Sequence, residues 1–146
     1  MLPNEAAQAY KMVRVVIDTN VLVSALIDDG KPRKLILELL DKHTVVLSRK
    51  MLAEFADVAG RKKFSIASNQ VERFLSIMVK IAKIVPDRAL FIEVALDPDD
   101  DVVLNAAYVG KADYIVTGDN HLLDLIKFKK TKIVTVNQML TILEMQ

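Results

Sequence analysis

The chain has 146 residues, of which 52% are hydrophobic and 27% are charged, and its formal net charge is +1. This length predicts one domain, and the apolar content is ample for a packed core, which excludes a disordered chain. The lack of cysteine excludes disulfides, thiolate metal sites and a cysteine nucleophile. The small net charge argues against a protein that coats nucleic acid through bulk charge, although a local basic patch remains compatible with it.

No apolar run approaches the roughly 18 residues that a membrane span requires, and the first eleven residues lack the apolar core of a signal peptide. We therefore expect a cytoplasmic protein without a membrane partner. Residues 1–12 contain Pro3, Asn4 and a second methionine, Met12, and are expected to form a flexible leader. Met12 is a candidate natural start, and residues 13–146 are expected to form a single domain.

Strands and helices are predicted to alternate along the chain. The first expected strand ends at Ile17, and the others span 44–47, 83–85, 114–117 and 132–136. The first expected helices span 20–27 and 32–42, followed by one from Ser48 to Gly60 and one from Ser68 or Asn69 through Ile81. Further helices are expected from the aspartates at 97–101 to Val109, near 122–126, and after a cap at Asn137. Residues 91–96 are compatible with a strand or a turn. This alternation predicts an α/β fold, a three-layer sandwich with a central, mostly parallel sheet flanked by helices.

Two runs of β-forming residues end on an acidic residue. The run VRVVIDTN begins at Val13 and stops at Asp18, and the run YIVTGD begins at Tyr114 and stops at Asp119. An acid that follows a buried strand lies at the carboxyl edge of the sheet, where open α/β sheets place their chemistry. If these two strands lie side by side, Asp18 and Asp119 face one crevice.

Two further acids lie on the apolar faces of predicted helices. Glu54 has apolar residues three positions before it and four after it, so it shares the buried face, whereas Asp57 falls on the solvated face. The residues three, four and seven positions after Asp100 are all apolar, whereas Asp101 is followed at these positions by polar and aromatic residues as well. The spacing therefore predicts that Glu54 and Asp100 point inward.

Four carboxylates, those of Asp18, Glu54, Asp100 and Asp119, would give one site a charge close to −4. Carboxylates about 4 Å apart repel by roughly 4 kcal/mol per pair at an effective dielectric constant of 20, so the site needs neutralisation. Mg²⁺ and Mn²⁺ prefer oxygen ligands and are commonly held by carboxylates together with substrate phosphates. A pair of such ions activates water and stabilises in-line displacement at phosphorus, which indicates phosphodiester hydrolysis.

Polar and basic residues near these acids are candidates for supporting roles. Asn20 and Thr117 can orient a carboxylate, a metal-bound water or the scissile phosphate. The candidate RNA-binding residues fall in basic clusters, namely Arg49 and Lys50, Arg61, Lys62 and Lys63, and the lysines at 127, 129, 130 and 132. Solvated faces are the simpler interpretation of these clusters, because only Phe64 and Phe128 interleave with them.

Four segments together resemble the PIN domain family, in the branch that includes the VapC toxins of toxin-antitoxin pairs: VVIDTNVLVSAL, the acid in SRKMLAEF, DPDDDVVLNAA and ADYIVTGDNHLL. The resemblance runs from about Val13 to Leu143. It implies a parallel sheet flanked by helices, metal-dependent ribonuclease activity on single-stranded or structured RNA, and homodimers. It also implies, for many members, a small antitoxin that blocks the site.

Residue by residue, the resemblance implies catalytic and metal-binding roles for Asp18, Glu54, Asp100 and Asp119, with Asn20 and Thr117 in supporting roles. The family pattern has fewer neighbouring aspartates than this chain, so Asp101 remains an alternative third acid. Asp100 lies twelve residues before Ala112, where the ADYIVTGD segment begins, and this spacing favours Asp100 as the third acid. Asp97 and Asp101 are candidate accessory residues.

Three alternatives to this interpretation remain open. The DTN motif at Asp18 is compatible with simple helix capping, and the aspartates at 97–101 with a solvated turn around Pro98. A catalytically silent PIN-like module that binds nucleic acid or protein would keep the fold without activity. An aspartyl-phosphate phosphatase or a receiver-like domain also places an acid after its first strand. The phosphatase needs a D-x-D motif where this chain has DTN, and the receiver needs a lysine at the end of a late strand, where this chain has Asp119.

Overall fold

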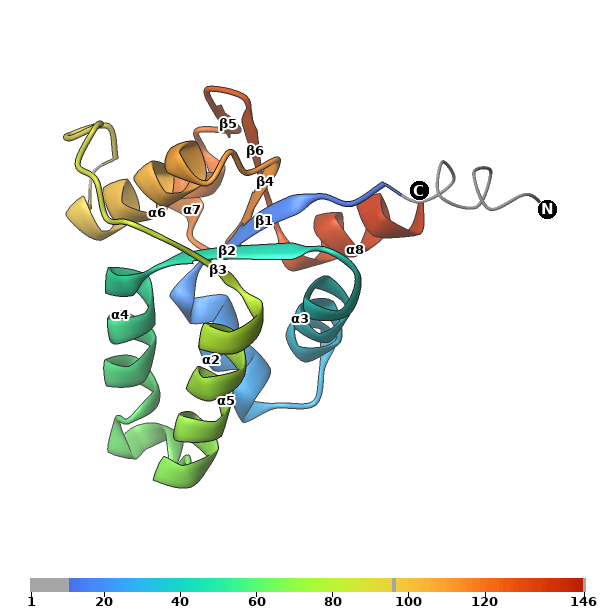
Figure 1. Ribbon diagram of the computed structural model, residues 1–146, viewed down its shortest axis with the longest axis vertical. Coiled ribbons are helices and arrows are strands. Elements are labelled where there is room, and N and C mark those ends of the chain that lie inside the picture. Colours follow the sequence, from blue (N-terminus) through green and yellow to red (C-terminus); the bar gives the residue numbers. More distant parts are fainter. Residues whose placement is uncertain (1–10, 96, 146) are drawn as a thin grey trace.

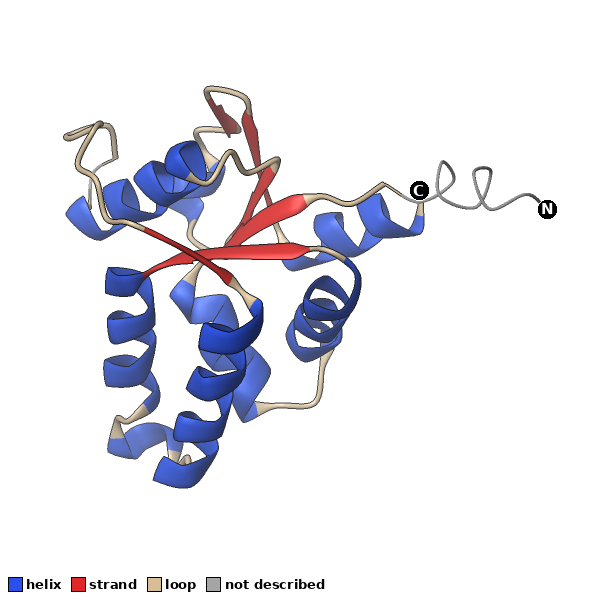
Figure 2. Cartoon of the chain, in the orientation of Figure 1, coloured by secondary structure: helices blue, strands red, loops and turns tan. Residues whose placement is uncertain are grey.

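The computed structural model describes residues 11–95 and 97–145, so almost all of the expected leader lies outside the described residues. Figure 2 shows its helices and strands. The strands are β1 (Arg14–Ile17), β2 (Thr44–Ser48), β3 (Lys83–Val85), β4 (Tyr114–Val116), β5 (Lys127–Phe128) and β6 (Thr131–Val134). The helices are α2 (Thr19–Ile27), α3 (Lys31–Lys42), α4 (Arg49–Ala59), α5 (Ser68–Ile81), α6 (Pro98–Val109), α7 (Asn120–Leu123) and α8 (Val136–Glu144), with a 3₁₀ turn η1 (Lys62–Phe64).

The strands form one sheet in the order β3-β2-β1-β4-β6-β5. Neighbouring strands from β3 to β6 are parallel, and β5 pairs with β6 in the antiparallel sense. Helix α6 covers one face of the sheet, whereas α2, α3, α4 and α5 lie on the other (Figure 1), and α8 packs against α3. The predicted fold class, a three-layer α/β sandwich with a mostly parallel sheet, is confirmed.

Beyond their first residues, the central strands bury apolar side chains on both faces, because helices cover both faces of the sheet. Val15, Val16 and Ile17 of β1 are fully buried, as is Ile115 of β4. Each such side chain contributes about 1.5–3 kcal/mol on burial, and β-branched residues fit the pleated backbone. No helix in the described part of the chain is long and apolar enough to cross a membrane.

Strand β1 lies at the point where the strand order reverses, since it pairs with β2 on one side and with β4 on the other. Val16 is in register with Ile115, and one residue later Ile17 is in register with Val116. The Asp18 amide continues the ladder by donating to the Val116 carbonyl at 2.9 Å. The two strands that end on acidic residues therefore lie side by side, as predicted, and their carboxyl ends meet at a topological switch point.

Two predicted helix caps are wrong. Helix α8 begins after Thr135, whose hydroxyl accepts from the Gln138 amide while the Gln138 side chain accepts from the Thr135 amide, so Asn137 is not the cap. This reciprocal capping box satisfies two backbone donors, which a lone Asn137 could not do. Helix α5 has its N-cap at residue 67, and both Ser68 and Asn69 lie inside it.

The hairpin of β5 and β6 was not predicted. A helix was expected near 122–126, but α7 ends at Leu123 and the chain turns into β5, where Lys127 pairs with Lys132 and Phe128 with Thr131. The lysines that dominate this segment hide its strand pattern, because they occupy the solvated positions of an edge hairpin.

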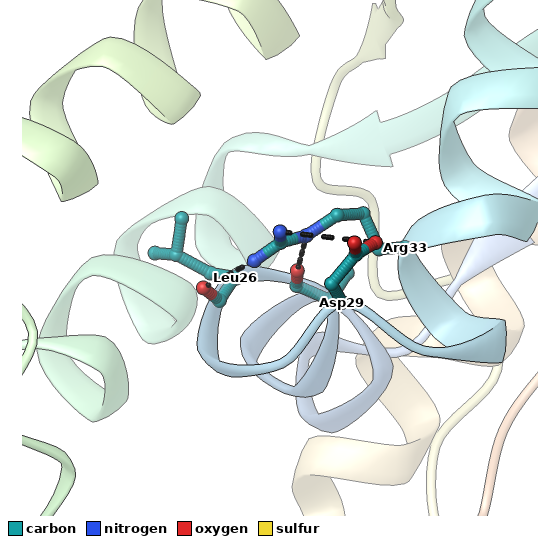
Figure 3. A network of polar contacts seen from close by, with 4 residues as sticks. Leu26, Asp29 and Arg33 are labelled. Carbon is teal, nitrogen blue, oxygen red and sulfur yellow. Dashed lines mark hydrogen bonds and ion pairs between the residues drawn. The ribbon is translucent and has the colours of Figure 1, made fainter.

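Arg33 closes the turn between α2 and α3 (Figure 3). Its guanidinium donates to the carbonyl oxygens of Ala25 at 2.8 Å and Leu26 at 3.0 Å, and it lies 4.0 Å from the Asp29 carboxylate. The last carbonyls of a helix have no partners within the helix, and a cation there also opposes the negative end of the helix dipole. Arg33 thus holds α2, which begins at the site described below, against α3.

Gly110 ends α6 for a packing reason. Its φ and ψ of −82° and −2° are right-handed, so a side chain is compatible with its backbone. A Cβ atom there would lie 2.5 Å from Val46 Cγ1 and 3.0 Å from the Ala106 carbonyl oxygen. The helix end is therefore pressed against β2, and the next residue, Lys111, takes the left-handed conformation, with φ of 53°.

We expect Gly110→Ala to lower the free energy of unfolding by about 1–3 kcal/mol, because the added methyl overpacks the contact with Val46. Urea denaturation measures this change. Gly118→Ala is the matched control, since a Cβ at Gly118 meets no atom within 4 Å. Equal stabilities of the two variants would contradict the packing argument.

Candidate active site

Asp18 occupies the N-cap position of α2, yet its side chain forms no capping hydrogen bond. Instead its Oδ2 accepts a 2.7 Å hydrogen bond from the Thr117 hydroxyl, and the residue is only 7% exposed. Burial raises the pKa of Asp18, the hydrogen bond from Thr117 opposes this rise, and the charge of Asp119 adds to it. Helix capping, the simpler interpretation of the DTN motif, therefore does not account for this side chain.

Thr117 links the ends of the two strands. Its side chain is fully buried directly after β4. Its hydroxyl donates to Asp18 and accepts at 3.0 Å from the amide of Asp119. One hydroxyl thus sets the position of a carboxylate from the first strand relative to the backbone that carries a second carboxylate.

Asp119 is exposed in part at the start of the short helix α7. Its Oδ1 accepts from the His121 amide at 2.9 Å, so it caps this helix as well as facing the crevice. Its negative charge raises the pKa of both Asp18 and Asp100. These electrostatic effects place the three carboxylates in one neighbourhood, although Asp18 lies far from the other two in sequence.

The aspartates at the start of α6 have different roles. Asp97 is the N-cap, and its Oδ1 accepts from the Asp99 amide at 2.9 Å. The two carboxylate oxygens of Asp101 accept from the amides of Glu93 and Ala95, each at 2.9 Å. Asp101 therefore anchors the irregular segment before the helix. A strand or turn was expected over 91–96, but residues 91–95 form bends, and residue 96 lies outside the described residues.

Among residues 11–95 and 97–145, Asp100 has no such backbone partners. It is 6% exposed, and no described residue forms a hydrogen bond with its buried Oδ2. Burial raises the pKa of Asp100 to about 7, with further contributions from the charge and hydrogen bond of Asp119 and from the charges of Asp18 and Asp97. Of the two candidates for the third acid, Asp101 has both carboxylate oxygens bonded to backbone amides, whereas Asp100 keeps one buried oxygen without a hydrogen bond in the described part of the chain.

Glu54 lies half-buried on α4 and faces the same crevice. Burial raises its pKa first, and the charges of Asp99 and then Asp18 raise it further, while a hydrogen bond with Thr19 lowers it. The Thr19 hydroxyl also lies 3.5 Å from Asp18 Oδ1. Sequence reasoning missed both Thr19, which bridges two of the acids, and Asp99, the strongest electrostatic neighbour of Glu54. Thr19 is the middle residue of the DTN motif, so the sequence offered a reason to consider it.

Asn20 is exposed on the first turn of α2 and lines a hollow of about 430 Å³ together with Thr117 and Gly118. Ser24, Lys31 and Asn137 line its other sides. Thr117 and Gly118, in the lining of this hollow, directly precede Asp119 in the chain, so the hollow lies at the carboxyl end of β4. Asn20 is therefore placed beside the crevice, where a substrate group could reach it.

The basic clusters near α4 are divided by the fold. Arg49 and Lys50 begin the helix close to the sheet edge, whereas Arg61, Lys62 and Lys63 follow its far end, about 16 Å along the axis. Arg61 pairs with Asp57 at 3.6 Å, and Lys63 lies over the Phe64 ring. The structure thus does not bring these two clusters together into one patch.

A divalent cation at this site would need several oxygen ligands. In residues 11–95 and 97–145, no group of three or more histidine, cysteine, aspartate or glutamate side chains is already arranged to hold a metal ion. The donor chemistry nevertheless fits a hard cation, since all the candidate ligands are carboxylates. The unpartnered, buried oxygen of Asp100 and the mutual repulsion of Asp18, Asp100 and Asp119 are both relieved by positive charge.

Residues 14–121 match the PIN domain family. The chain belongs to this family. PIN domains are in general nucleases, and they generally use divalent metal ions. The predicted family resemblance is confirmed, and the matched segment includes all four candidate acids.

One sequence relative and two solved structures are similar to this chain. The uncharacterized protein MJ1680 of Methanocaldococcus jannaschii is 35% identical over 119 residues, which cover 77% of this chain and 75% of that protein. A chain of the VapBC2 structure from Rickettsia felis, bound to a DNA fragment from its promoter, has a TM-score of 0.60 at 19% identity, and covers 84% of this chain and 98% of its own. PAE2754 from Pyrobaculum aerophilum has a TM-score of 0.59 at 20% identity, with 92% and 91% covered.

We expect the free energy of unfolding of the metal-free protein to fall as the pH rises from about 4 to 7. Asp100 has a usual pKa of 3.8 and a folded pKa of about 7, so over this range the folded state holds a proton that the unfolded state has lost. Asp100→Asn removes this penalty and should stabilise the protein at pH 7.5 by about 1 kcal/mol or more, with little effect at pH 4.

Urea denaturation in the presence of chelator at both pH values measures this difference. Asp57→Asn is the control, because it removes an exposed carboxylate from the solvated face of α4. A stabilisation of Asp100→Asn that is equal at the two pH values would contradict the electrostatic argument.

Proposed function

We propose that this PIN domain is a metal-dependent endoribonuclease that hydrolyses RNA phosphodiester bonds with Asp18, Glu54, Asp100 and Asp119. The observation that carries the proposal is the buried, uncommitted carboxylate of Asp100 beside Asp18 and Asp119. Membership of a nuclease family supports it independently. A carboxylate cluster of this kind destabilises the protein by itself, so its retention favours a catalytic role over a silent binding module.

The chain's own side chains would prepare the site in distinct ways. The four acids would hold one or two Mg²⁺ or Mn²⁺ ions, which when bound supply a Lewis acid for the phosphate and activate water. Thr117 holds Asp18 in a single position through its 2.7 Å hydrogen bond. Asp101 and Asp97 act as accessories by fixing the start of α6, so that Asp100 keeps its place. Asn20 is positioned to contact the substrate from α2.

The biological context we propose is that of a toxin in a toxin-antitoxin pair. One fold neighbour comes from a VapBC complex, and this supports a small antitoxin as partner. An antitoxin that covers the crevice would keep the nuclease silent. We propose a homodimer as the working assembly, by analogy with the VapC branch that the sequence resembles.

We expect purified protein to cleave labelled single-stranded RNA with Mg²⁺ or Mn²⁺ and not with chelator. Asp18→Asn and Asp100→Asn should each lower kcat by about 100-fold or more, since each removes a carboxylate that would hold the metal ion. Asp57→Asn should keep the wild-type rate, because its side chain lies on the solvated face of α4. Metal-independent cleavage, or equal rates for Asp18→Asn and Asp57→Asn, would contradict the proposed mechanism.

We also expect Mg²⁺ or Mn²⁺ at about 100 times its Kd to raise the Tm by roughly 5–10 °C, because binding to the folded state alone stabilises it. Asp18→Asn should raise the metal-free Tm and lose most of this response, since it relieves repulsion and removes a ligand. Differential scanning calorimetry with an equal ionic strength of NaCl as control measures both effects. An unchanged response in Asp18→Asn would place the bound metal elsewhere.

A further inference from the structure

A second polar hollow lies at the opposite end of the sheet from the acids. It has a volume of about 730 Å³ and is lined by Tyr108 and Lys111 from the end of α6, by Asp113 before β4, and by Lys129 and Lys130 from the β5–β6 hairpin. Figure 1 shows this hairpin beside the end of α6 that leads into β4. Three lysines thus converge on one hollow from two segments about twenty residues apart in sequence.

The hollow carries a net positive charge, since three lysines and one acid, Asp113, line it. In the part of the chain that the structure describes, none of the three lysines has an ion-pair partner. The single acid, Asp113, already accepts a hydrogen bond from the Arg14 amide at 2.8 Å. A concave site with this excess of positive charge attracts an anion, and neighbouring lysines suit successive phosphates of a nucleic-acid strand.

Aromatic side chains lie beside the lysines. Phe91 contacts Tyr108 at 4.8 Å and Phe128 at 5.1 Å between ring centroids, both edge to face. The Lys129 ammonium lies 5.0 Å from the Phe91 ring centroid. Tyr108 is 48% exposed on the rim, so part of its ring is open to a stacking partner. The sequence shows only Phe128 among these lysines, whereas the fold adds two aromatic residues from distant segments.

The position of Phe91 in this cluster is fixed from α6. The Asn105 side chain accepts from the Phe91 amide at 2.9 Å and donates to the Phe91 carbonyl at 2.7 Å. Two of the lysines are also held in a costly backbone conformation, with φ of 53° at Lys111 and 56° at Lys129. Glycine would adopt this conformation without strain, so these positions keep a charged side chain at the expense of stability.

We infer that this hollow binds single-stranded RNA, with Lys111, Lys129 and Lys130 on successive phosphates and a base stacked on Tyr108. The choice of RNA as ligand rests on the proposed function. Basic grooves with exposed aromatic rings bind single strands without reading their sequence. Tyr108 lies eight residues after Asp100 on α6, about 12 Å along the helix axis, so one strand could reach both ends. The hollow therefore anchors nucleotides outside the scissile bond.

The first test measures binding of a fluorescein-labelled, mixed-sequence 15-nucleotide RNA to the full chain in chelator, where no cleavage occurs. The triple variant Lys111→Ala, Lys129→Ala and Lys130→Ala should weaken binding and lower the slope of log Kd against log salt by roughly 2. The charge-matched control carries Lys34→Ala, Lys80→Ala and Lys83→Ala, all exposed lysines away from the hollow. Equal losses in the two triple variants would overturn the inference, because bulk charge would then account for binding.

The stacking role is tested at Tyr108. We expect Tyr108→Leu to weaken binding by about 5- to 100-fold, whereas Tyr108→Phe should bind as wild type because it keeps the ring. Tm values show whether either variant is unfolded. A second readout requires no substitution: RNA carrying 5-iodouridine should photo-cross-link to Tyr108 in the wild-type chain, as identified by peptide mass spectrometry. Cross-links confined to residues near Asp18, or to Lys62 and Lys63, would overturn the inference.

Failure of this inference differs from failure of the proposed function. If metal-dependent cleavage persists with an unchanged KM in the triple hollow variant, the nuclease stands and the hollow is not an RNA site. If RNA binds and cross-links to Tyr108 but no metal supports cleavage, the RNA site stands and the proposed activity is wrong. Binding of an acidic peptide with no binding of RNA would overturn the inference and make the hollow a protein contact.

Discussion

Mutual repulsion among carboxylates at the end of β1 and β4 is the constraint on which the site depends. Burial and the charge of Asp119 raise the pKa of both Asp18 and Asp100, to about 7 for Asp100. Such a cluster opposes folding unless protons or cations neutralise it. The rest of the domain, chiefly its central sheet buried on both faces, supplies the stability that offsets this repulsion. Positive charge at this position would relieve the repulsion, and this is the physical basis of the metal site proposed above.

The second requirement is that the acids cannot relax apart. Parallel pairing fixes β1 and β4 in register, and the Thr117 hydroxyl joins Asp18 to the Asp119 amide across that pair. At the other side of the crevice, Asp101 uses both carboxylate oxygens on backbone amides and so fixes the helix that carries Asp100. The two neighbouring aspartates thus have different roles. Asp101 is hydrogen-bonded and fixes the backbone, whereas Asp100 keeps one oxygen without a hydrogen bond from the described residues, close to the other acids.

Sequence patterns predicted the features that depend on local periodicity. Apolar runs located the parallel strands, strand ends located Asp18 and Asp119, and helical spacing ranked Asp100 above Asp101. These patterns failed where the deciding contact joins residues distant in sequence, or where two nearby residues are alternative candidates for the same role. The capping box at Thr135 outweighed Asn137, and the hairpin at 127–134 was hidden because lysines fill its solvated positions. Asp99 became visible as a neighbour of Glu54 only once the structure placed α4 beside α6.

The β5–β6 hairpin illustrates why basic runs are hard to interpret from sequence. Its lysines alone are typical of a solvated face, and only Phe128 interrupts them. Folding brings Phe91 and Tyr108 to the same place, with Asn105 holding the Phe91 backbone and Lys129 lying over its ring. Lysines in a strained backbone conformation beside clustered aromatic rings are not typical of an ordinary solvated surface. Because α6 carries Asp100 at one end and Tyr108 at the other, this one helix links the acids to the basic hollow that Tyr108 lines.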